Sequence, residues 1–330
     1  MNAVVNGRFL SHQVTGVQRY GQEILGWMGD RLRVVRPKNA MIGIRGHAWE
    51  QFILPRMIRP GEILWSPANA GPLAVVNQVL TIHDLSPLEH PEWFKPAFSL
   101  WYRLLWPLLV RRVKRILTLS EYVRGKVIAR FSLRAEQVVA VPGGVDRTRF
   151  CPSEISPGNY VLFVGSLEPR KNLFGLLQAW ELVKDKQPDF SLVIAGASGN
   201  VFQPVAWPSK TERVHWIGYV SETDLPTLYA RAALFILPSF DEGFGLTLLE
   251  AMACGTPVAA AKAGALPEVV GDAGLFFDPA NGSEMATTIE RALTDQPLRQ
   301  ILREKGLGRA EKFSWPNSAE RIWQVLQECQ

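Results

Sequence analysis

The 330-residue sequence has little cysteine and no long hydrophobic run. Its three cysteines, Cys151, Cys254 and Cys329, form no Cys-x-x-Cys pair, which argues against a disulfide framework and against a zinc site. The N-terminal segment has no long apolar stretch of the kind a secretory signal requires. No uncharged apolar run reaches the roughly 18 residues of a membrane span. We therefore expect a cytoplasmic protein.

Two chemical motifs are also missing. The sequence has no Asp-x-Asp motif, so it lacks the acidic pair that often holds Mg²⁺ or Mn²⁺ against a diphosphate. No Gly-x-Gly-x-x-Gly follows any candidate strand, which makes a nicotinamide-dependent oxidoreductase a weak alternative. Hydrophobic residues make up 47% of the chain and charged residues 20%, as in globular proteins, which argues against extensive disorder.

The charge is unevenly distributed along the chain. Residues 1–148 contain 20 Lys and Arg against 10 Asp and Glu, whereas residues 149–330 contain 16 against 21. A basic first half indicates an anionic partner surface, such as lipid head groups or a lipid-linked phosphate. Nucleic acid is the alternative partner, but no nucleic-acid-binding motif appears, so we expect none.

Short apolar runs recur along the chain with helix-length intervals between them. This alternation predicts βαβ units and parallel sheets, and therefore an α/β fold. The expected strands are residues 3–6, 63–65, 79–82, 116–119 and 138–141 in the first half, and 160–164, 191–195, 214–217, 234–237 and 257–261 in the second. The composition breaks near residues 151–158, which we expect to be a linker between two domains.

Two short segments carry the chemistry. Arg170 and Lys171 lie where the strand-like run 160–164 gives way to a helical stretch, at the carboxyl edge of the expected sheet. Cations beside the positive end of a helix are unfavourable without an anion, so a purely surface role for this pair is the weaker interpretation. After the run 234–237, the segment 242–250 starts with a carboxylate, exposes glycine-flanked amides and ends with a second carboxylate. The cations and amides suit phosphate groups, and the two carboxylates suit hydroxyl groups of the same ligand. A ligand with phosphate at one end and hydroxyl groups along the rest is a nucleotide-sugar.

These motifs and five others, in this order along the chain, resemble those of the family 4 glycosyltransferases, which are retaining enzymes of GT-B architecture that use nucleotide-sugars. The resemblance covers almost the whole chain. The matching segments are Thr15-Gly16-Val17-Gln18-Arg19-Tyr20, Thr81-Ile82-His83-Asp84-Leu85, Leu119-Ser120-Glu121-Tyr122, Val141-Pro142-Gly143-Gly144-Val145-Asp146, residues 165–172, residues 242–250 and Leu266-Pro267-Glu268-Val269-Val270-Gly271-Asp272.

The resemblance implies two Rossmann-like domains whose parallel sheets face a central cleft. Residues 1–150 would form the acceptor-binding domain, and residues 151–312 would bind the nucleotide-sugar. Residues 313–330 would form a C-terminal helix that crosses back to the first domain. The first half is short for this family, so inference about the acceptor is weakest there.

The resemblance also assigns roles. Glu242, the first glutamate of the motif, would lie against the donor sugar, while Glu250 would accept hydrogen bonds from the ribose. Arg170 and Lys171 would neutralise the diphosphate without a metal, and no cofactor is expected. One departure is Ser166, which stands where many members have an arginine, so Arg170 would carry more of this load. Further expected donor contacts are the amides of Gly16, Phe244, Gly245 and Leu246, and, for the base, Tyr219 and Val220.

His83 ends the expected strand 79–82 and, by resemblance, would face the donor sugar. A lone histidine is more often a structural hydrogen-bonding group, but the strand-end position favours a functional role. The other four histidines, His12, His47, His90 and His215, have no such setting, and we interpret them as structural.

Residues 98–116 contain Trp101, Tyr102 and Trp106 and then the basic cluster Arg111, Arg112, Lys114 and Arg115. This stretch fits two interpretations equally well. It is either a face that lies on an anionic membrane or a core helix with a solvated basic end.

The expected function is transfer of a sugar from a nucleotide-sugar to a glycan or lipid-linked acceptor in bacterial polysaccharide or lipopolysaccharide synthesis, with retention of configuration. The first candidate for the donor is GDP-mannose, which would transfer mannose. The expected location is cytoplasmic, with peripheral contact at the inner face of the inner membrane as one alternative. A UDP- or dTDP-sugar donor, a catalytically silent nucleotide-sugar-binding subunit and a nucleotide-sugar epimerase stay open as alternatives.

Overall fold

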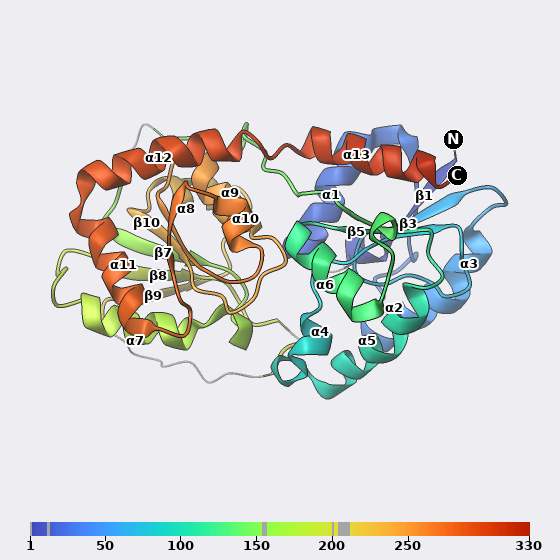
Figure 1. Cartoon of the computed structure of the whole chain (residues 1–330), viewed down its shortest axis with the longest axis horizontal. Helices are drawn as coiled ribbons and strands as arrows, with labels where there is room; N and C mark the ends of the chain where they lie inside the picture. The colour runs from blue at the N-terminus through green and yellow to red at the C-terminus, as the bar shows by residue number, and fades with distance from the viewer. Residues whose placement is uncertain (1, 12–13, 154–156, 200, 204–211) are drawn as a thin grey trace. The chain divides into compact units, whose positions relative to one another are not determined.

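The structure, a computed structural model, describes residues 2–11, 14–153, 157–199, 201–203 and 212–330. The chain forms two compact units (Figure 1). The N-terminal unit comprises residues 1–89, 97–143 and 314–330, and the C-terminal unit comprises residues 90–96 and 144–313. We expected the boundary between the domains after residue 150. In the structure the N-terminal unit ends at Gly143, and residues 90–96 belong to the C-terminal unit.

Each unit contains a six-stranded parallel sheet. In the N-terminal unit the order is β2-β1-β3-β4-β5-β6, and in the C-terminal unit it is β12-β11-β10-β7-β8-β9. The strands are β1 (Ala3–Asn6), β2 (Leu32–Val35), β3 (Ile63–Ser66), β4 (Gln78–Thr81), β5 (Arg115–Thr118), β6 (Val138–Ala140), β7 (Tyr160–Val164), β8 (Ser191–Ala195), β9 (Val214–Gly218), β10 (Leu234–Leu237), β11 (Val258–Ala261) and β12 (Gly274–Phe277).

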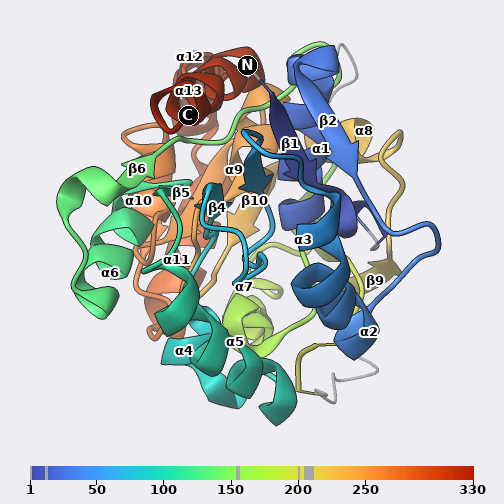
Figure 2. The ribbon, with the colours of Figure 1, turned by 90° about the vertical axis from the view of Figure 1, so that its right-hand side faces the viewer.

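Helices connect the strands. In the C-terminal unit α7 packs against α11, and α12 packs against α9, whereas in the N-terminal unit α13 packs against α1 (Figures 1 and 2). The α-helices are α1 (Gly16–Met28), α2 (Gly43–Ala48), α3 (Leu54–Met57), α4 (Ser86–Glu89), α5 (Pro96–Leu109), α6 (Glu121–Phe131), α7 (Leu173–Val183), α8 (Leu225–Ala230), α9 (Leu246–Ala253), α10 (Leu266–Val270), α11 (Gly282–Thr294), α12 (Gln296–Ala310) and α13 (Trp315–Glu328). Short 3₁₀ segments are η1 (Gly7–Ser11), η2 (Gly29–Arg31), η4 (Pro91–Trp93), η5 (Ala135–Gln137) and η6 (Pro169–Lys171), and η3 (Trp49–Ile53) is a π-helical turn.

The inner strands are largely buried and mostly apolar because helices cover the sheets on both faces. All four residues of β1, β3, β4, β10 and β11 are buried. One core cluster of the N-terminal unit joins Trp106 of α5 to Leu80 of β4 and Ile116 of β5. No helix in the described part of the chain is long and apolar enough to cross a membrane.

All ten expected strands are present, with ends that differ by no more than one residue. Two strands were not predicted, β2 and β12, and each lies at the outer edge of its sheet.

The strand orders locate the place where each sheet binds ligands. Open parallel sheets bind ligands beyond the carboxyl ends of the strands where the order reverses direction. In the C-terminal unit this point lies between β7 and β10, and in the N-terminal unit between β1 and β3. The segments that follow these four strands are therefore the candidates for function.

Candidate active site

The segment after β7 presents two cations at the carboxyl edge of the C-terminal sheet. It forms the turn η6, and Asn172 then takes a left-handed conformation with φ of 53°. The Asn172 side chain caps α7 by accepting a hydrogen bond from the Gly175 amide at 3.3 Å. This sharp turn ends the segment and leaves Arg170 and Lys171 at the strand end.

The segment after β10 brings Glu242 to the same place. Glu242 is only 6% exposed, and its backbone carbonyl accepts a hydrogen bond from Ala265 at 2.9 Å. Gly264, with φ of +58°, makes this close approach possible, because a Cβ there would lie 2.5 Å from the Glu242 nitrogen. No sequence motif identifies Gly264, because its role depends on a contact with a distant loop.

Arg170, Lys171 and Glu242 meet in one hydrogen-bonded cluster. Lys171 Nζ lies 2.5 Å from Glu242 Oε1, and Arg170 Nη1 lies 2.8 Å from Glu242 Oε2. The Ser239 hydroxyl also donates to Glu242 Oε1, at 2.7 Å. The structure therefore brings together three of the four predicted catalytic residues and adds Ser239, which the sequence analysis did not single out.

A second carboxylate, Glu168, fixes Arg170. Glu168 is fully buried, and its Oε1 accepts from Nε of Arg170 at 2.9 Å and from Nη2 at 2.7 Å. Nη1 of Arg170 donates in addition to the Asp241 carbonyl at 3.0 Å. All three guanidinium nitrogens thus donate to protein atoms, whereas the Lys171 ammonium has three N–H groups and one hydrogen bond within the described residues. Lys171 is therefore the better placed of the two to bind a phosphate.

The charge balance keeps Glu242 ionised. Burial acts to raise its pKa, but the charges of Arg170 and Lys171 outweigh burial and lower the pKa from 4.5 to about 2. With Glu168 included, the cluster holds two cations and two carboxylates. At neutral pH Glu242 is a hydrogen-bond acceptor, suited to sugar hydroxyls or to a developing positive charge.

Helix α9 carries the second predicted carboxylate. Its first residue is Leu246, and Gly245 precedes it with φ of 109°, a conformation that favours glycine. The first amides of a helix have no intrahelical acceptor, so those at this helix start are suited to an anion. Glu250 is 3% exposed and accepts a hydrogen bond from the Tyr229 hydroxyl at 2.9 Å. Its contact with a ribose stays a prediction.

Of the remaining predicted donor contacts, Phe244 directly precedes Gly245, and the others lie elsewhere. Phe244 is buried, with its ring centroid 5.8 Å from that of Phe313. Tyr219, 53% exposed, and Val220 directly follow β9, the edge strand of the C-terminal sheet. Gly16 is the first residue of α1 in the N-terminal unit. Their roles toward the donor stay predictions.

His83 lies at the carboxyl end of β4 in the N-terminal unit and is 7% exposed. Its Nε2 lies 2.8 Å from the Pro67 carbonyl, so Nε2 carries the proton and Nδ1 is the acceptor nitrogen. Its ring also contacts that of Tyr20 edge-on at 5.0 Å. Burial lowers the pKa of His83 and outweighs the opposing effects of Pro67 and Asp84, so the imidazole is neutral at pH 7. Its action on a donor sugar stays a prediction.

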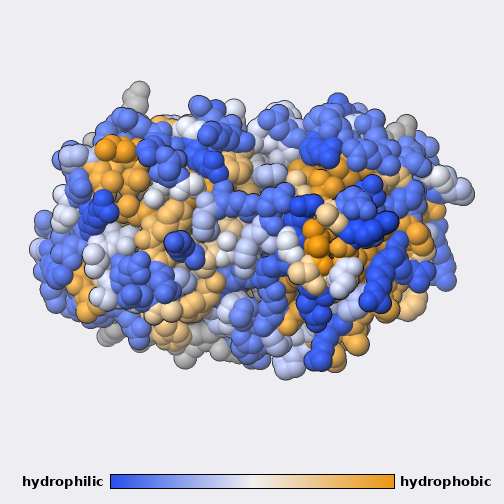
Figure 3. All heavy atoms as spheres, viewed as in Figure 1, coloured by the Kyte–Doolittle hydropathy of each residue, from blue (hydrophilic) through white to orange (hydrophobic). Residues whose placement is uncertain are grey.

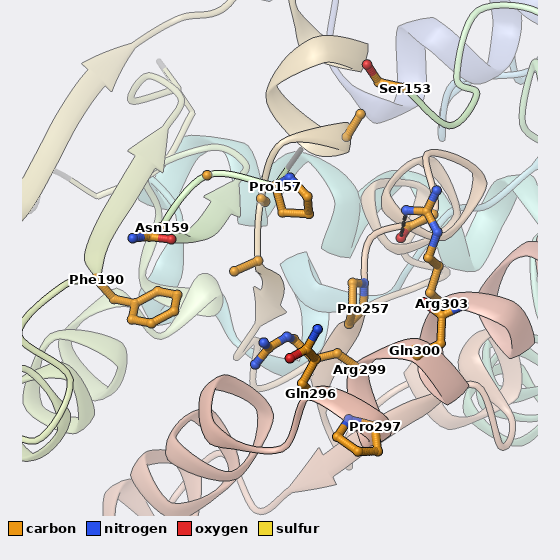
Figure 4. Close-up of a pocket in the computed structure, with 15 residues that line it drawn as sticks. Ser153, Pro157, Asn159, Phe190, Pro257, Gln296, Pro297, Arg299, Gln300 and Arg303 are labelled. Atoms are coloured by element: carbon orange, nitrogen blue, oxygen red, sulfur yellow. Dashed lines mark hydrogen bonds between the residues drawn. The ribbon is translucent and has the colours of Figure 1, made fainter. Parts of the chain in front are cut away.

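A pocket of about 830 Å³ lies at the opposite edge of the C-terminal sheet (Figure 4). Its lining includes Asn159, Phe190 and Pro257, which directly precede β7, β8 and β11. Arg299 and Arg303 also line it, and they donate to the carbonyls of Ala292 at 2.7 Å and Gly255 at 2.9 Å. Both arginines thus bind the ends of helices, and the pocket is separate from the Glu242 cluster.

Within the described ranges, no group of three or more His, Cys, Asp or Glu side chains is arranged to hold a metal ion. Neutralisation of a diphosphate by Lys171 and backbone amides, without a metal, stays a prediction.

Comparisons with known proteins agree with this geometry. A model of group 1 glycosyl transferases matches residues 146–309, and a model of glycosyltransferase family 4 matches residues 61–149. The O-antigen chain mannosyltransferase B of Escherichia coli is 36% identical over 255 residues, covering 72% of this chain and 67% of that protein. The MMP alpha-(1->4)-mannosyltransferase of Mycolicibacterium hassiacum is 31% identical over 246 residues, covering 72% of this chain and 60% of that protein. The chain belongs to the glycosyltransferases of family 4.

Solved structures show the same fold. Anabaena Alr3699/HepE in complex with UDP-glucose aligns with a TM-score of 0.77 at 18% identity, over 99% of this chain and 100% of that chain. WaaG, a glycosyltransferase involved in lipopolysaccharide biosynthesis, aligns with a TM-score of 0.74 at 18% identity, over 99% of both chains. The predicted α/β fold of GT-B type, with two parallel sheets, is confirmed.

Proposed function

We propose that the protein transfers a sugar from a nucleotide-sugar to a glycan or lipid-linked acceptor in bacterial polysaccharide or lipopolysaccharide synthesis, with retention of configuration. The observation that carries this proposal is the cluster of Lys171, Arg170 and Glu242 at the point where the strand order of the C-terminal sheet reverses. Its cations suit a diphosphate, and its buried carboxylate suits the sugar beside it.

GDP-mannose is the first donor that we propose. The support is the likeness to a mannosyltransferase of O-antigen chains at 36% identity. A uridine nucleotide is the second candidate, because a neighbour of the same fold was solved with UDP-glucose. We expect the base at Tyr219, which is exposed, and at Val220, and neither side chain distinguishes guanine from uracil.

Within this function Lys171 binds the leaving diphosphate, and Arg170 acts as a positioning residue that holds Glu242 toward the sugar. The amides at the start of α9 bind the same phosphates, and Glu250 binds the ribose. The leaving phosphate oxygen would take the proton of the acceptor hydroxyl on the face from which it departs, so no separate protein base is needed.

A donor panel tests the proposal. Thermal-shift titrations with GDP, UDP, dTDP and their common sugar conjugates should identify the base first and the sugar second. A ligand at 100 times its dissociation constant should stabilise the protein by about 2.7 kcal/mol. The anomeric configuration of the product, read by NMR, should match that of the donor. Stabilisation by none of these compounds would contradict the proposal.

We also propose peripheral contact with an anionic membrane through α5. Leu100, Leu104 and Leu108 follow one another at helical spacing and are 55%, 61% and 56% exposed, and Arg111 and Arg112 are exposed just beyond. In the region where Figure 1 places α5, Figure 3 shows hydrophobic residues beside strongly hydrophilic ones. Such a contact would bring a lipid-linked acceptor to the N-terminal unit.

A further inference from the structure

The pocket at the amino edge of the C-terminal sheet has no role in the proposed sugar transfer (Figure 4). It lies where the chain enters β7, β8 and β11, whereas the Glu242 cluster follows the carboxyl ends of β7 and β10. Its volume of about 830 Å³ lies within the range of about 300–1,000 Å³ that is typical of small-molecule sites. The pocket is therefore large enough to hold a ligand of its own.

Two arginines of α12 supply the charge of this pocket. Arg299 and Arg303 are one helical turn apart, so both lie on the face of α12 that lines the pocket. The described lining residues include no carboxylate, and neither arginine forms an ion pair with any described residue. Asp295, which precedes α12, accepts a hydrogen bond from the Leu298 amide at 2.9 Å. Among the described residues, the two positive charges therefore have no carboxylate beside them in the pocket.

Each guanidinium is fixed by one of its nitrogens and open at the others. Nη1 of Arg299 donates to the Ala292 carbonyl at 2.7 Å, in the last turn of α11. Nη1 of Arg303 donates to the Gly255 carbonyl at 2.9 Å, just beyond the end of α9. Nε and Nη2 of both residues donate to no described protein atom, and none of these nitrogens is sealed from solvent. They form an edge by which a guanidinium can bind two oxygens of a phosphate or a carboxylate.

The lining combines separate positive groups with an apolar wall. In Figure 4 the two arginine side chains extend from α12 in different directions, and their carbonyl partners belong to different elements. Each guanidinium can therefore bind an anionic group of its own. The wall includes Ala232, Ala233 and Pro257, which are buried, and Phe190, which is half-buried. An organic group would cover this apolar surface, whereas inorganic phosphate would leave it in water.

We propose that this pocket binds a small organic molecule with two anionic groups, at least one of them a phosphate, and that Arg299 and Arg303 each bind one of these groups. The organic part lies against Phe190 and the apolar wall. Hydrogen bonds between a guanidinium and an anion are charge-assisted, so each contributes more than a neutral hydrogen bond. The proposal does not depend on sugar transfer, because the lining of the pocket shares no residue with the Glu242 cluster.

Calorimetric titration with two matched pairs of compounds tests the proposal. Fructose 1,6-bisphosphate and 3-phosphoglycerate carry two anionic groups, whereas fructose 6-phosphate and glycerol 3-phosphate keep one phosphate and lack the second anionic group. The unmodified protein should bind at least one of the first two about tenfold more tightly than its partner, because the partner lacks one charged contact. No saturable binding of either, or equal affinities within both pairs, would overturn the proposal.

The arginine variants test which groups make these contacts. Arg299→Gln should lower the affinity for the compound with two anionic groups to about that of its partner, and Arg303→Gln should do the same. Both arginines also bind carbonyls at the ends of helices, so a thermal melt of each variant checks its folding. Unchanged affinity in both variants would overturn the proposal.

A further variant keeps the hydrogen bonds of both arginines. Gln296 is exposed, lines the pocket and is the first residue of α12, where a carboxylate favours the helix. Gln296→Glu should therefore fold normally and weaken binding about tenfold, because its charge repels the ligand. The control is Ser283→Glu, which places the same charge in the first turn of α11, outside the lining of the pocket, and should bind as the unmodified protein does. Normal binding by Gln296→Glu would contradict the location of the site.

Lys171→Ala distinguishes this pocket from the Glu242 cluster. This variant should bind the compound as tightly as the unmodified protein does, because Lys171 does not line the pocket. Loss of binding in Lys171→Ala would mean that the compound occupies the Glu242 cluster, and this would overturn the inference. A protein that transfers no sugar would contradict the proposed function, and these titrations would still decide whether the pocket binds its ligand.

Discussion

At the scale of single residues, the distribution of hydrogen bonds separates two neighbouring cations. Arg170 donates through all three of its nitrogens to Glu168, Asp241 and Glu242, whereas among the described residues Lys171 has one such bond, to Glu242. The sequence predicted the same phosphate-binding role for both. The two cations differ because the buried carboxylate of Glu168 binds Arg170 and not Lys171. No motif in the sequence predicts this contact.

Lys171→Ala should therefore weaken binding of a nucleoside diphosphate by about 1.5–3 kcal/mol, the size of a hydrogen bond to a charged group. A nucleoside without phosphate should bind as before, because the change removes only a phosphate contact. Calorimetric titration of both ligands measures this, with the exposed Lys186→Ala as a control in the same unit. An equal loss for both ligands would refute the phosphate assignment.

Arg170→Gln should give the opposite pattern. Affinity for a nucleoside diphosphate should change little, while turnover should fall about 100-fold or more, because Glu242 loses a fixed donor that orients it. Glu168→Gln should lower turnover in the same direction by loosening Arg170. Steady-state kinetics beside calorimetry checks this prediction, and a selective loss of nucleotide affinity in Arg170→Gln would count against it.

Glu242 should also make the free energy of unfolding depend on pH. Its pKa in the folded protein, about 2, lies below the ordinary 4.5, so its stabilising contribution is complete above about pH 4.5. It is lost as the pH falls toward 2, and the shift corresponds to about 3 kcal/mol. The difference in free energy of unfolding between the unmodified protein and Glu242→Gln should shrink by about this amount over the same range. Denaturant titrations at several pH values measure it, and a constant difference would contradict the assignment.

At the scale of elements, α5 shows where sequence patterns stop being informative. The sequence left open whether its aromatic residues form a membrane face or a core. Tyr102 and Trp106 are buried in the core of the N-terminal unit, so the exposed face consists of the leucines instead. The basic cluster is also smaller than its sequence suggested. Lys114 donates to the Cys329 carbonyl, and Arg115 begins β5.

Membrane binding should therefore depend on the leucines and on two arginines. Replacing Leu100, Leu104 and Leu108 by serine, or Arg111 and Arg112 by glutamine, should release the protein from anionic vesicles. Each basic residue near such a surface contributes about 1 kcal/mol, and added salt should mimic the arginine changes. Vesicle sedimentation measures this, with a thermal melt to confirm folding. An unmodified protein that stays in the supernatant at low salt would leave α5 as a solvated helix.

At the scale of the whole molecule, the sequence predicted ten strands, including the edge strands β6 and β9, and missed the edge strands β2 and β12. The predicted strands stand out as short apolar runs in the sequence. The two missed strands lack so clear a run, because β2 contains Arg33 and the exposed Val34 and β12 begins with glycine. In the site, residues next to strand ends in sequence were predicted. Gly264 was missed because its role depends on a contact with a distant loop, and Ser239, three residues before Glu242, was not singled out.

Sugar transfer should need no divalent metal, because Lys171 and the helix-start amides can neutralise the diphosphate. Turnover of the donor in excess EDTA should equal turnover with added Mg²⁺ or Mn²⁺. A strict metal requirement would contradict this expectation.

The central claim is that the Glu242 cluster carries out sugar transfer from a nucleotide-sugar. The most direct test is the rate of GDP release from GDP-mannose, with UDP-, dTDP- and other nucleotide-sugars in parallel, by the unmodified protein and by Glu242→Ala. The account predicts release of one nucleoside diphosphate coupled to formation of a glycoside by the unmodified protein. Glu242→Ala should bind that nucleoside diphosphate almost as tightly and release none from its sugar conjugate. Equal rates for the two proteins, or no transfer from any donor, would contradict the account.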